Sequence, residues 1–283
     1  EYRKRALGEM VTDSVLMYPT FSKDLHGSIR FEEPRNAVQK ILAENDGNPP
    51  PNWARYMVVD PGHSVCAVTF WAVTPPGLGE HVIAYDELYL QQCTAEKFGA
   101  AVAHKVGGDT FQSFIIDAHG GRIREIGSGV LPRRQYSLQL ERQGVKSVET
   151  GSNFRSGSDD IAGREMKLRD WLSVRQDGTT KMMVTLQRCP NLIREFFRFK
   201  KKIVNGFVTD DGNRRGNCHA IETCEYAAAH GLHYVKPENG IKKLSVAGRI
   251  IKDRNARSQQ RSINKRVESG QFHSYINLGP SGD

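Results

Sequence analysis

The sequence has little of what marks a secreted or membrane protein. It holds five cysteines among 283 residues, an odd number with no Cys-x-x-Cys pair. That pattern argues against a disulfide framework and a zinc ribbon, and it fits a reducing compartment. No apolar run approaches the ~20 residues that span a bilayer, and no signal peptide is recognisable. We therefore expect a protein that is neither secreted nor bound in a membrane. The first residue is Glu1 rather than Met, so we also expect a fragment of a longer polypeptide.

Positive charge is concentrated at the end of the chain. The whole sequence has 40 Lys and Arg against 32 Asp and Glu, a net charge of +8. From Ile241 onward there are nine basic and three acidic residues, so most of the excess lies there. Such a tail is suited to binding phosphates or an acidic protein, and it is equally typical of a solvated chain end. A nucleic-acid-binding function must therefore rest on the body of the protein.

Composition divides the chain into three parts. Residues 1–53 form a lead-in segment with a predicted helix at 35–44, and it closes with the Pro-rich linker "NDGNPPPNW". Residues 54–235 carry the regular apolar patterns of a domain, and residues 236–283 form the basic tail. We expect the chemistry of the protein to lie in the middle part.

Three strand-like runs open the domain, at 55–60, 65–74 and 81–90. They are rich in Val, Ile, Tyr and Phe, and the loops between them are too short for parallel crossovers, so we expect antiparallel neighbours. A helix at 94–108 then leads to a buried strand at 111–117, which should run parallel to a neighbour. The later part of the domain predicts helices at about 132–143, 159–174, 190–199 and 216–230, and strands at 145–149 and 181–186.

This order of elements predicts an α/β fold. We expect a mixed sheet of five or more strands, with the first three antiparallel and with helices on both faces. The ribonuclease H-like fold has this order, although the order alone is weak evidence for it.

Two strands of this sheet end on a carboxylate. "MVVD" ends at Asp60, before Pro-Gly, and "FIID" ends at Asp117, before "AHGGR". If the two strands are neighbours, both side chains emerge at one edge of the sheet. Two close carboxylates repel each other unless a cation lies between them, and Mg²⁺ prefers oxygen ligands. Each aspartate alone also fits a turn or a cap, but together they favour a metal site.

A third ligand is expected from the helix at 216–230. His219 and Glu222 are three residues apart, so they share a face of that helix, and Tyr226 lies about one turn further on. A histidine and a carboxylate on one face could both reach a cation. Taken alone, these residues are better explained as an ordinary first-turn pair, with Glu222 favoured by the helix dipole.

Two other carboxylates are second-tier candidates. Asp160, after Asp159, opens the helix at 159–174, where a role as N-cap explains it fully. Glu87 lies in the middle of the strand at 81–90, and a buried glutamate in a central strand is costly unless it binds something.

Taken together, these motifs resemble a known family, the C-terminal nuclease domain of the large terminase subunit of tailed bacteriophages. Single motifs are weakly specific, whereas their order and spacing over about residues 5–235 are fairly specific. The similar segments are "ALGEM" with "YPTFSKDLH", "VVDPG", "IAYDELYL", "FIIDAHGGR", "CPNLIREFFRFK" and "DDGNRRGNCHAIETCEYA".

The resemblance implies a set of site residues. Asp60, Asp117 and Glu222 would bind two Mg²⁺ or Mn²⁺ ions, with His219 as an assisting residue. The family usually has Asp where this chain has Glu222, whose side chain is one methylene longer and so would change the distance to the second metal. Basic residues that could meet the phosphates of DNA are Arg122, Arg124, Arg133 and Arg134.

The resemblance also implies an activity and its partners. It implies an endonuclease that cuts concatemeric double-stranded DNA with little sequence preference during phage DNA packaging, in the host cytoplasm. Its partners would be a terminase ATPase domain, the small terminase subunit and the portal or procapsid. This chain has no Gly-x-x-x-x-Gly-Lys-Ser/Thr loop, so the motor would have to lie upstream of Glu1.

Other functions stay open at this point. Another ribonuclease H-like nuclease, such as a junction resolvase or a ribonuclease H, would use the same carboxylates. A sugar-kinase or actin-like nucleotide-binding domain would need a second Asp-x-Gly hairpin and a late Gly-Gly contact, and neither is found late in the chain. A non-catalytic module that docks on a portal or on DNA through the basic tail is the third alternative.

Overall fold

The computed structural model describes residues 15–27, 34, 36–119, 131–214 and 218–237. Contacts divide the chain into two units, Glu1–Pro237 and Glu238–Asp283, and the second unit lies outside the described residues. The division into a lead-in, a nuclease domain and a tail stays a prediction. Among the described residues, no helix combines the length and the apolar character needed to cross a membrane.

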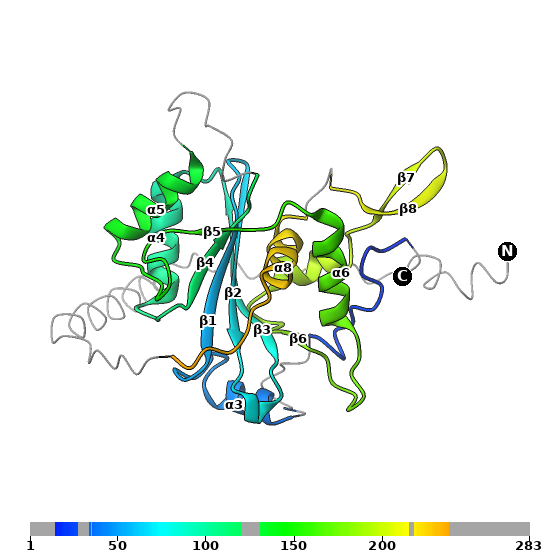
Figure 1. Ribbon diagram of the computed structural model, residues 1–283, viewed down its shortest axis with the longest axis horizontal. Helices are drawn as coiled ribbons and strands as arrows, with labels where there is room; N and C mark the ends of the chain where they lie inside the picture. The colour runs from blue at the N-terminus through cyan, green and yellow to red at the C-terminus, as the bar shows by residue number, and fades with distance from the viewer. Residues whose placement is uncertain (1–14, 28–33, 35, 120–130, 215–217, 238–283) are drawn as a thin grey trace, which may run out of the picture. The chain divides into compact units, whose positions relative to one another are not determined.

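Six strands form one mixed sheet, in the order β5-β4-β1-β2-β3-β6 (Figure 1). The first three pair antiparallel, because residues 61–64 and 74–81 are too short to cross over. The β1–β4, β4–β5 and β3–β6 pairs are parallel. The predicted mixed α/β sheet of five or more strands, with its first three strands antiparallel, is therefore confirmed. The strands are β1 (Ala54–Asp60), β2 (Val65–Val73), β3 (Val82–Gln91), β4 (Ser113–Ile116), β5 (Arg155–Ser156) and β6 (Met182–Val184).

Helices cover both faces of the sheet (Figure 1). On one face α4 and α5 pack over a core that includes Met57 and Val59 of β1, and on the other face α6, α7 and α8 pack over Tyr56 and Val58. This division follows the alternation of side chains along a strand. The helices are α3 (Ala37–Glu44), α4 (Ala95–Val106), α5 (Pro132–Arg142), α6 (Ile161–Leu172), α7 (Pro190–Phe196) and α8 (His219–His230).

The lead-in segment contributes to both cores. Met17, Tyr18 and Phe21 belong to the core beneath α8, and Leu42 of α3 belongs to the core beneath α4. Leu16 forms an antiparallel bridge with Lys200, and Met17 N–H donates to the Phe199 carbonyl over 2.9 Å. These contacts bring the start of the described chain beside the segment that follows α7.

The strand predicted at 145–149 is wrong. Ser147 makes only isolated bridges, to Phe111 and Gly151, and its hydroxyl accepts from the Thr150 N–H over 3.3 Å. Residues 147–151 therefore form a turn, with Gly151 in the left-handed region at φ 61°. The strand that pairs with β4 on the side away from β1 is the two-residue β5, a few residues further on.

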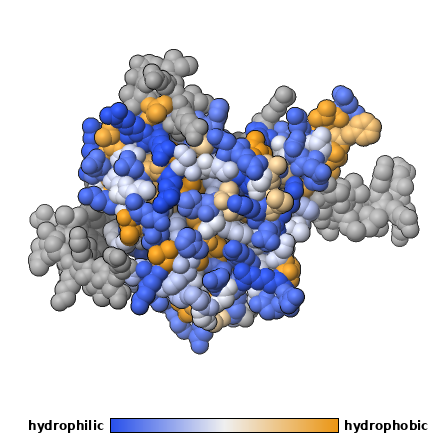
Figure 2. All heavy atoms as spheres, in the orientation of Figure 1, coloured by the Kyte–Doolittle hydropathy of each residue, from blue (hydrophilic) through white to orange (hydrophobic). Residues whose placement is uncertain are grey.

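A separate hairpin, β7 (Lys201–Val204) and β8 (Phe207–Gly212), was not predicted. Its turn is Asn205-Gly206, with φ of 49° and 81° at the two residues. Asn-Gly between apolar pairs is a strong hairpin signal, and the sequence "IVNGFV" carries it. The hairpin exposes apolar side chains that are visible as orange spheres in Figure 2, and 76% of Phe207 is accessible to solvent.

Candidate active site

Asp60 and Asp117 leave the sheet side by side. Val59 of β1 pairs with Ile116 of β4, and the Asp117 N–H donates to the Val59 carbonyl over 3.0 Å. Alternation along each strand directs both aspartates to the face of the sheet that α8 covers, as it does Val58 and Ile115. Both residues are buried, with 6% and 9% of their surfaces exposed. The structure thus brings together the two carboxylates expected from the sequence.

Helix α8 places a polar side chain against each aspartate. His219 Nδ1 lies 2.7 Å from Asp60 Oδ2, and the Tyr226 hydroxyl donates to Asp117 Oδ1. The two α8 residues are seven apart, which is about two helical turns, so they share one face. The His119 N–H also donates to Asp117 Oδ1, over 3.1 Å. Tyr226 was noted in the sequence only for its position, and its contact with Asp117 is new.

The charge of Asp60 is poorly compensated. Burial is the main cause that raises its pKa, to about 7, and the nearby Glu222 and Asp117 carboxylates raise it further. The hydrogen bond and charge of His219 oppose this rise. In turn the hydrogen bond to Asp60 is the main cause that raises the pKa of His219, with a smaller contribution from Glu222. Asp60, Asp117, His219 and Glu222 therefore form one electrostatic cluster.

Glu222 is held by an arginine that sequence reasoning missed. Arg214 Nη1 lies 3.0 Å from Glu222 Oε1, and Nη2 lies 2.8 Å from both Glu165 Oε1 and Glu225 Oε2. Tyr18, from the lead-in, donates to the other oxygen of Glu225 over 2.7 Å. Arg214 thus neutralises acids of both α6 and α8. No sequence signal marks it, because its partners lie on two helices far apart in the chain.

The donor chemistry of the cluster suits a hard divalent cation. Asp60 and Asp117 offer carboxylate oxygens, and Mg²⁺ is often held by one or two carboxylates together with substrate phosphates. Burial, and then the nearby Glu222 and Asp117 carboxylates, raise the pKa of Asp60, so a cation at this edge would stabilise its ionised form. Among the described residues, however, no three His, Cys, Asp or Glu side chains are arranged to hold a metal ion. Glu222 would need to exchange its contact with Arg214 before it could take part.

Both second-tier carboxylates cap helices. Glu87 accepts the N–H groups of Asn191 and Leu192, at 2.7 and 2.9 Å, in the first turn of α7. Asp160 accepts the Gly163 N–H over 3.0 Å at the start of α6, as its alternative explanation required. The cost of burying Glu87 is offset by these hydrogen bonds. Neither residue needs a metal ion to explain it.

The four predicted DNA-binding arginines fall into three groups. Arg122 and Arg124 lie outside the described residues. Arg133 is directed into the protein, where it donates to the Ser156 hydroxyl over 2.8 Å and to the Phe154 carbonyl. Arg134 is exposed on α5. Within this pair, only Arg134 has the exposure that a phosphate contact requires.

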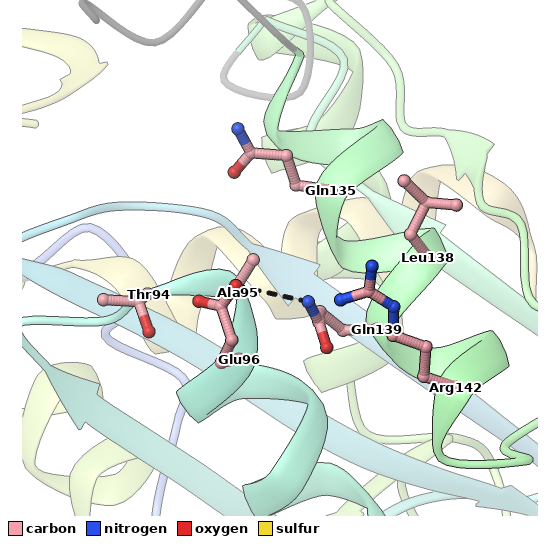
Figure 3. Close-up of a pocket in the computed structure, with 7 residues that line it drawn as sticks. All are labelled: Thr94, Ala95, Glu96, Gln135, Leu138, Gln139 and Arg142. Carbon is pink, nitrogen blue, oxygen red and sulfur yellow. Dashed lines mark hydrogen bonds between the residues drawn. The ribbon is translucent and has the colours of Figure 1, made fainter. Parts of the chain in front are cut away.

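A hollow lies between α4 and α5 (Figure 3). These two helices lie on the opposite face of the sheet from α8 (Figure 1). Gln139 donates to Glu96 across it over 3.3 Å, which ties the two helices together. None of its lining residues belongs to the Asp60 cluster. The residues that line it are Thr94, Ala95, Glu96, Gln135, Leu138, Gln139 and Arg142.

No protein-family model matches the chain, and no curated protein matches it in sequence. The solved structures that it resembles include the nuclease domain of the P22 large terminase, with a TM-score of 0.47 and 14% identity over 67% of this chain and 87% of that one. The nuclease domain of g2p, the large terminase of bacteriophage SPP1, crystallised with bound Mn, gives 0.41 and 17% over 64% and 87%. Thermus thermophilus RuvC gives 0.33 and 12% over 62% and 92%. Because these three TM-scores are below 0.5, only this chain's own residues support the chemistry of the site.

Proposed function

We propose that this chain is a metal-dependent endonuclease that hydrolyses phosphodiester bonds in double-stranded DNA. The observation that carries the proposal is the pair of buried carboxylates, Asp60 and Asp117, at the ends of two parallel neighbouring strands. Helix α8 places His219 against Asp60 and the Tyr226 hydroxyl against Asp117, with the Glu222 carboxylate nearby. This arrangement collects negative charge where a divalent cation and a phosphate could complete it.

Each residue of the cluster has a distinct role in the proposal. Asp60 and Asp117 would hold Mg²⁺ or Mn²⁺, and Glu222 would complete a second ion's site after release from Arg214. When bound, such ions lower the pKa of a water that attacks the phosphorus and stabilise the charge on the leaving 3′ oxygen. His219 orients Asp60 through Nδ1, and Tyr226 orients Asp117 through its hydroxyl. Both donors limit the rotation of the carboxylates and so pre-organise the site.

The biological setting proposed is phage DNA packaging. The sequence resemblance to large terminase nuclease domains supports this setting. The partners proposed with it are a terminase ATPase domain, the small terminase subunit and the portal or procapsid, in the host cytoplasm. Contacts from Arg134, and from Arg122 and Arg124, would go to phosphates and carry no base code. Cutting of concatemeric DNA would then show little sequence preference.

A cleavage assay with one isosteric substitution tests the proposal. Linear duplex DNA is incubated with the protein and Mg²⁺ or Mn²⁺, and Asp60→Asn is compared with wild type. We expect the rate to fall about 1000-fold or more, which is about 4 kcal/mol of barrier, because a charged metal ligand is lost. Asp160→Asn is the matched control, since asparagine caps a helix as well as aspartate does and this side chain lies at an exposed helix end.

The same assay separates the alternatives. Faster cutting of a four-way junction or of an RNA–DNA hybrid than of linear duplex would assign the site to a resolvase or to a ribonuclease H. DNA binding without any cation-dependent cutting by the wild type would favour a non-catalytic docking module. Unchanged cutting by Asp60→Asn would refute the proposed site.

A further inference from the structure

Helix α8 begins without a capping side chain of its own. Cys218 precedes its first residue and makes no side-chain cap hydrogen bond. The first turn of any helix has N–H groups without intrahelical partners, and these carry partial positive charge. Here a residue from another helix supplies the acceptor. Glu195 Oε2, from α7, accepts the N–H groups of Ala220 over 2.8 Å and Ile221 over 3.0 Å.

Both carboxylate oxygens of Glu195 accept hydrogen bonds. Its Oε1 accepts the Tyr89 hydroxyl over 2.8 Å, and only 1% of the residue is exposed. The Tyr89 ring lies edge-on to the His219 ring, with centroids 6.4 Å apart. One buried carboxylate therefore ties β3, α7 and the start of α8 together, beside the histidine that contacts Asp60.

A second buried carboxylate fixes the position of Glu195 itself. Glu87, from β3, caps α7 through the Asn191 and Leu192 N–H groups. The sheet thus holds α7 through Glu87, and α7 holds α8 through Glu195. The series ends with the contact between His219 of α8 and Asp60 of β1, so it begins and ends on the sheet.

We propose that Glu195 is a positioning residue, which sets His219 against Asp60 by fixing the first turn of α8. The inference rests on the proposed nuclease function for its activity readout. Ala220 and Ile221 directly follow His219, so a displacement of their backbone moves the imidazole as well. A misplacement of about 1 Å in a catalytic group can cost about 100-fold in rate.

The test replaces the acceptor while keeping the length of the side chain. Glu195→Met leaves the Ala220 and Ile221 N–H groups without an acceptor, and Glu195→Gln restores one oxygen for them. We expect Glu195→Met to lower kcat on linear duplex about 10- to 100-fold, with KM within about 2-fold, because positioning rather than binding is lost. Hydrogen exchange at Ala220 and Ile221 should accelerate in the same variant, and Glu195→Gln should recover most of both properties.

Thr94→Ala is the control for a merely structural effect. Thr94 caps α4, on the opposite face of the sheet, by accepting the Lys97 N–H over 3.2 Å. It should lower thermal stability without changing kcat or the exchange at Ala220. If Glu195→Met lowers stability but leaves kcat at the level of this control, the positioning role is refuted.

Two further outcomes are informative. If Glu195→Met does not fold, Tyr89→Phe decides, since it removes only the hydroxyl that orients Glu195: faster exchange at Ala220 and a few-fold lower kcat support the inference, and wild-type values of both overturn it. If the wild type itself does not cut DNA, the proposed function fails. Exchange at Ala220 and Ile221 then decides the inference alone, and an unchanged rate in Glu195→Met overturns it.

Discussion

Two regions of the molecule hold buried carboxylates in opposite ways. At the starts of α7 and α8, Glu87 and Glu195 accept backbone N–H groups of a helix first turn. At the ends of β1 and β4, Asp60 and Asp117 meet side chains of α8 and other carboxylates. In the first arrangement fixed backbone amides accompany each carboxylate, and in the second several carboxylates lie close to one another.

The pKa shifts express the same difference. Burial raises the pKa of Glu87, Glu195 and Asp60 alike. Backbone amides oppose the rise at the two glutamates, whereas at Asp60 only His219 opposes it while two carboxylates add to it. A carboxylate satisfied by fixed amides stabilises the fold, and one crowded by like charges is suited to a cation.

The largest expected difference between the two regions is the change in stability when a carboxylate is replaced. Glu87→Ala should lower the free energy of unfolding by about 3 kcal/mol, because it leaves buried amide groups unsatisfied. Asp60→Asn should leave that free energy unchanged or raise it in the metal-free protein, since it removes a charge that is buried among like charges. Urea denaturation at neutral pH measures both. A loss at Asp60→Asn as large as that at Glu87→Ala would erase the distinction.

The pH dependence of stability sharpens the comparison. Burial raises the pKa of Asp60 from its ordinary 3.8 to about 7 in the folded protein. The folded state therefore binds this proton more tightly, so the stabilisation is complete below about pH 4 and is lost as pH rises through about 7. The raised pKa of His219 acts in the same direction. We expect metal-free wild type to lose about 1–2 kcal/mol of stability between about pH 5 and 8.

Mn²⁺ should reverse this loss, because a bound cation favours the ionised carboxylate. Thermal unfolding of wild type and Asp60→Asn, each with Mn²⁺ or a chelator, provides the measurement and its control. The substitution should flatten the dependence on pH and abolish the response to Mn²⁺. If the stability of the metal-free wild type rises from pH 5 to 8, Asp60 is not buried among like charges as described.

The smallest expected effects concern two basic neighbours that show a similar contrast. Arg133 is bound to Phe154 and Ser156, so Arg133→Ala should cost about 1 kcal/mol of stability. Arg134 is exposed, so Arg134→Ala should leave stability unchanged and weaken duplex binding about 2- to 3-fold, with a salt slope smaller by about 1. Binding titrations at several salt concentrations measure this. An equal loss of duplex affinity in both variants would contradict the assignment of Arg133 to the fold and of Arg134 to DNA binding.

Local sequence patterns predicted the helices and strands that depend on residues close together in the chain. The helix expected at 94–108 is α4, which Thr94 caps and which Gly107 ends at φ 57°. The apolar runs that end in Asp60 and Asp117 became β1 and β4. The hairpin was missed although "IVNGFV" signalled it, and 145–149 was misread because Val148, one of its two β-branched residues, lies within a turn.

Periodicity and neighbours along the chain were enough to predict β1 to β4, β6, the helices α3 to α8 and the positions of the two strand-end aspartates. Only the tertiary structure decided which carboxylates are satisfied and which are crowded. Glu87, Glu195 and Glu222 are all glutamates near helices, but helix amides satisfy two of them and Arg214 holds the third. These partners are distant in sequence or lie on separate elements, and no local pattern encodes such pairings.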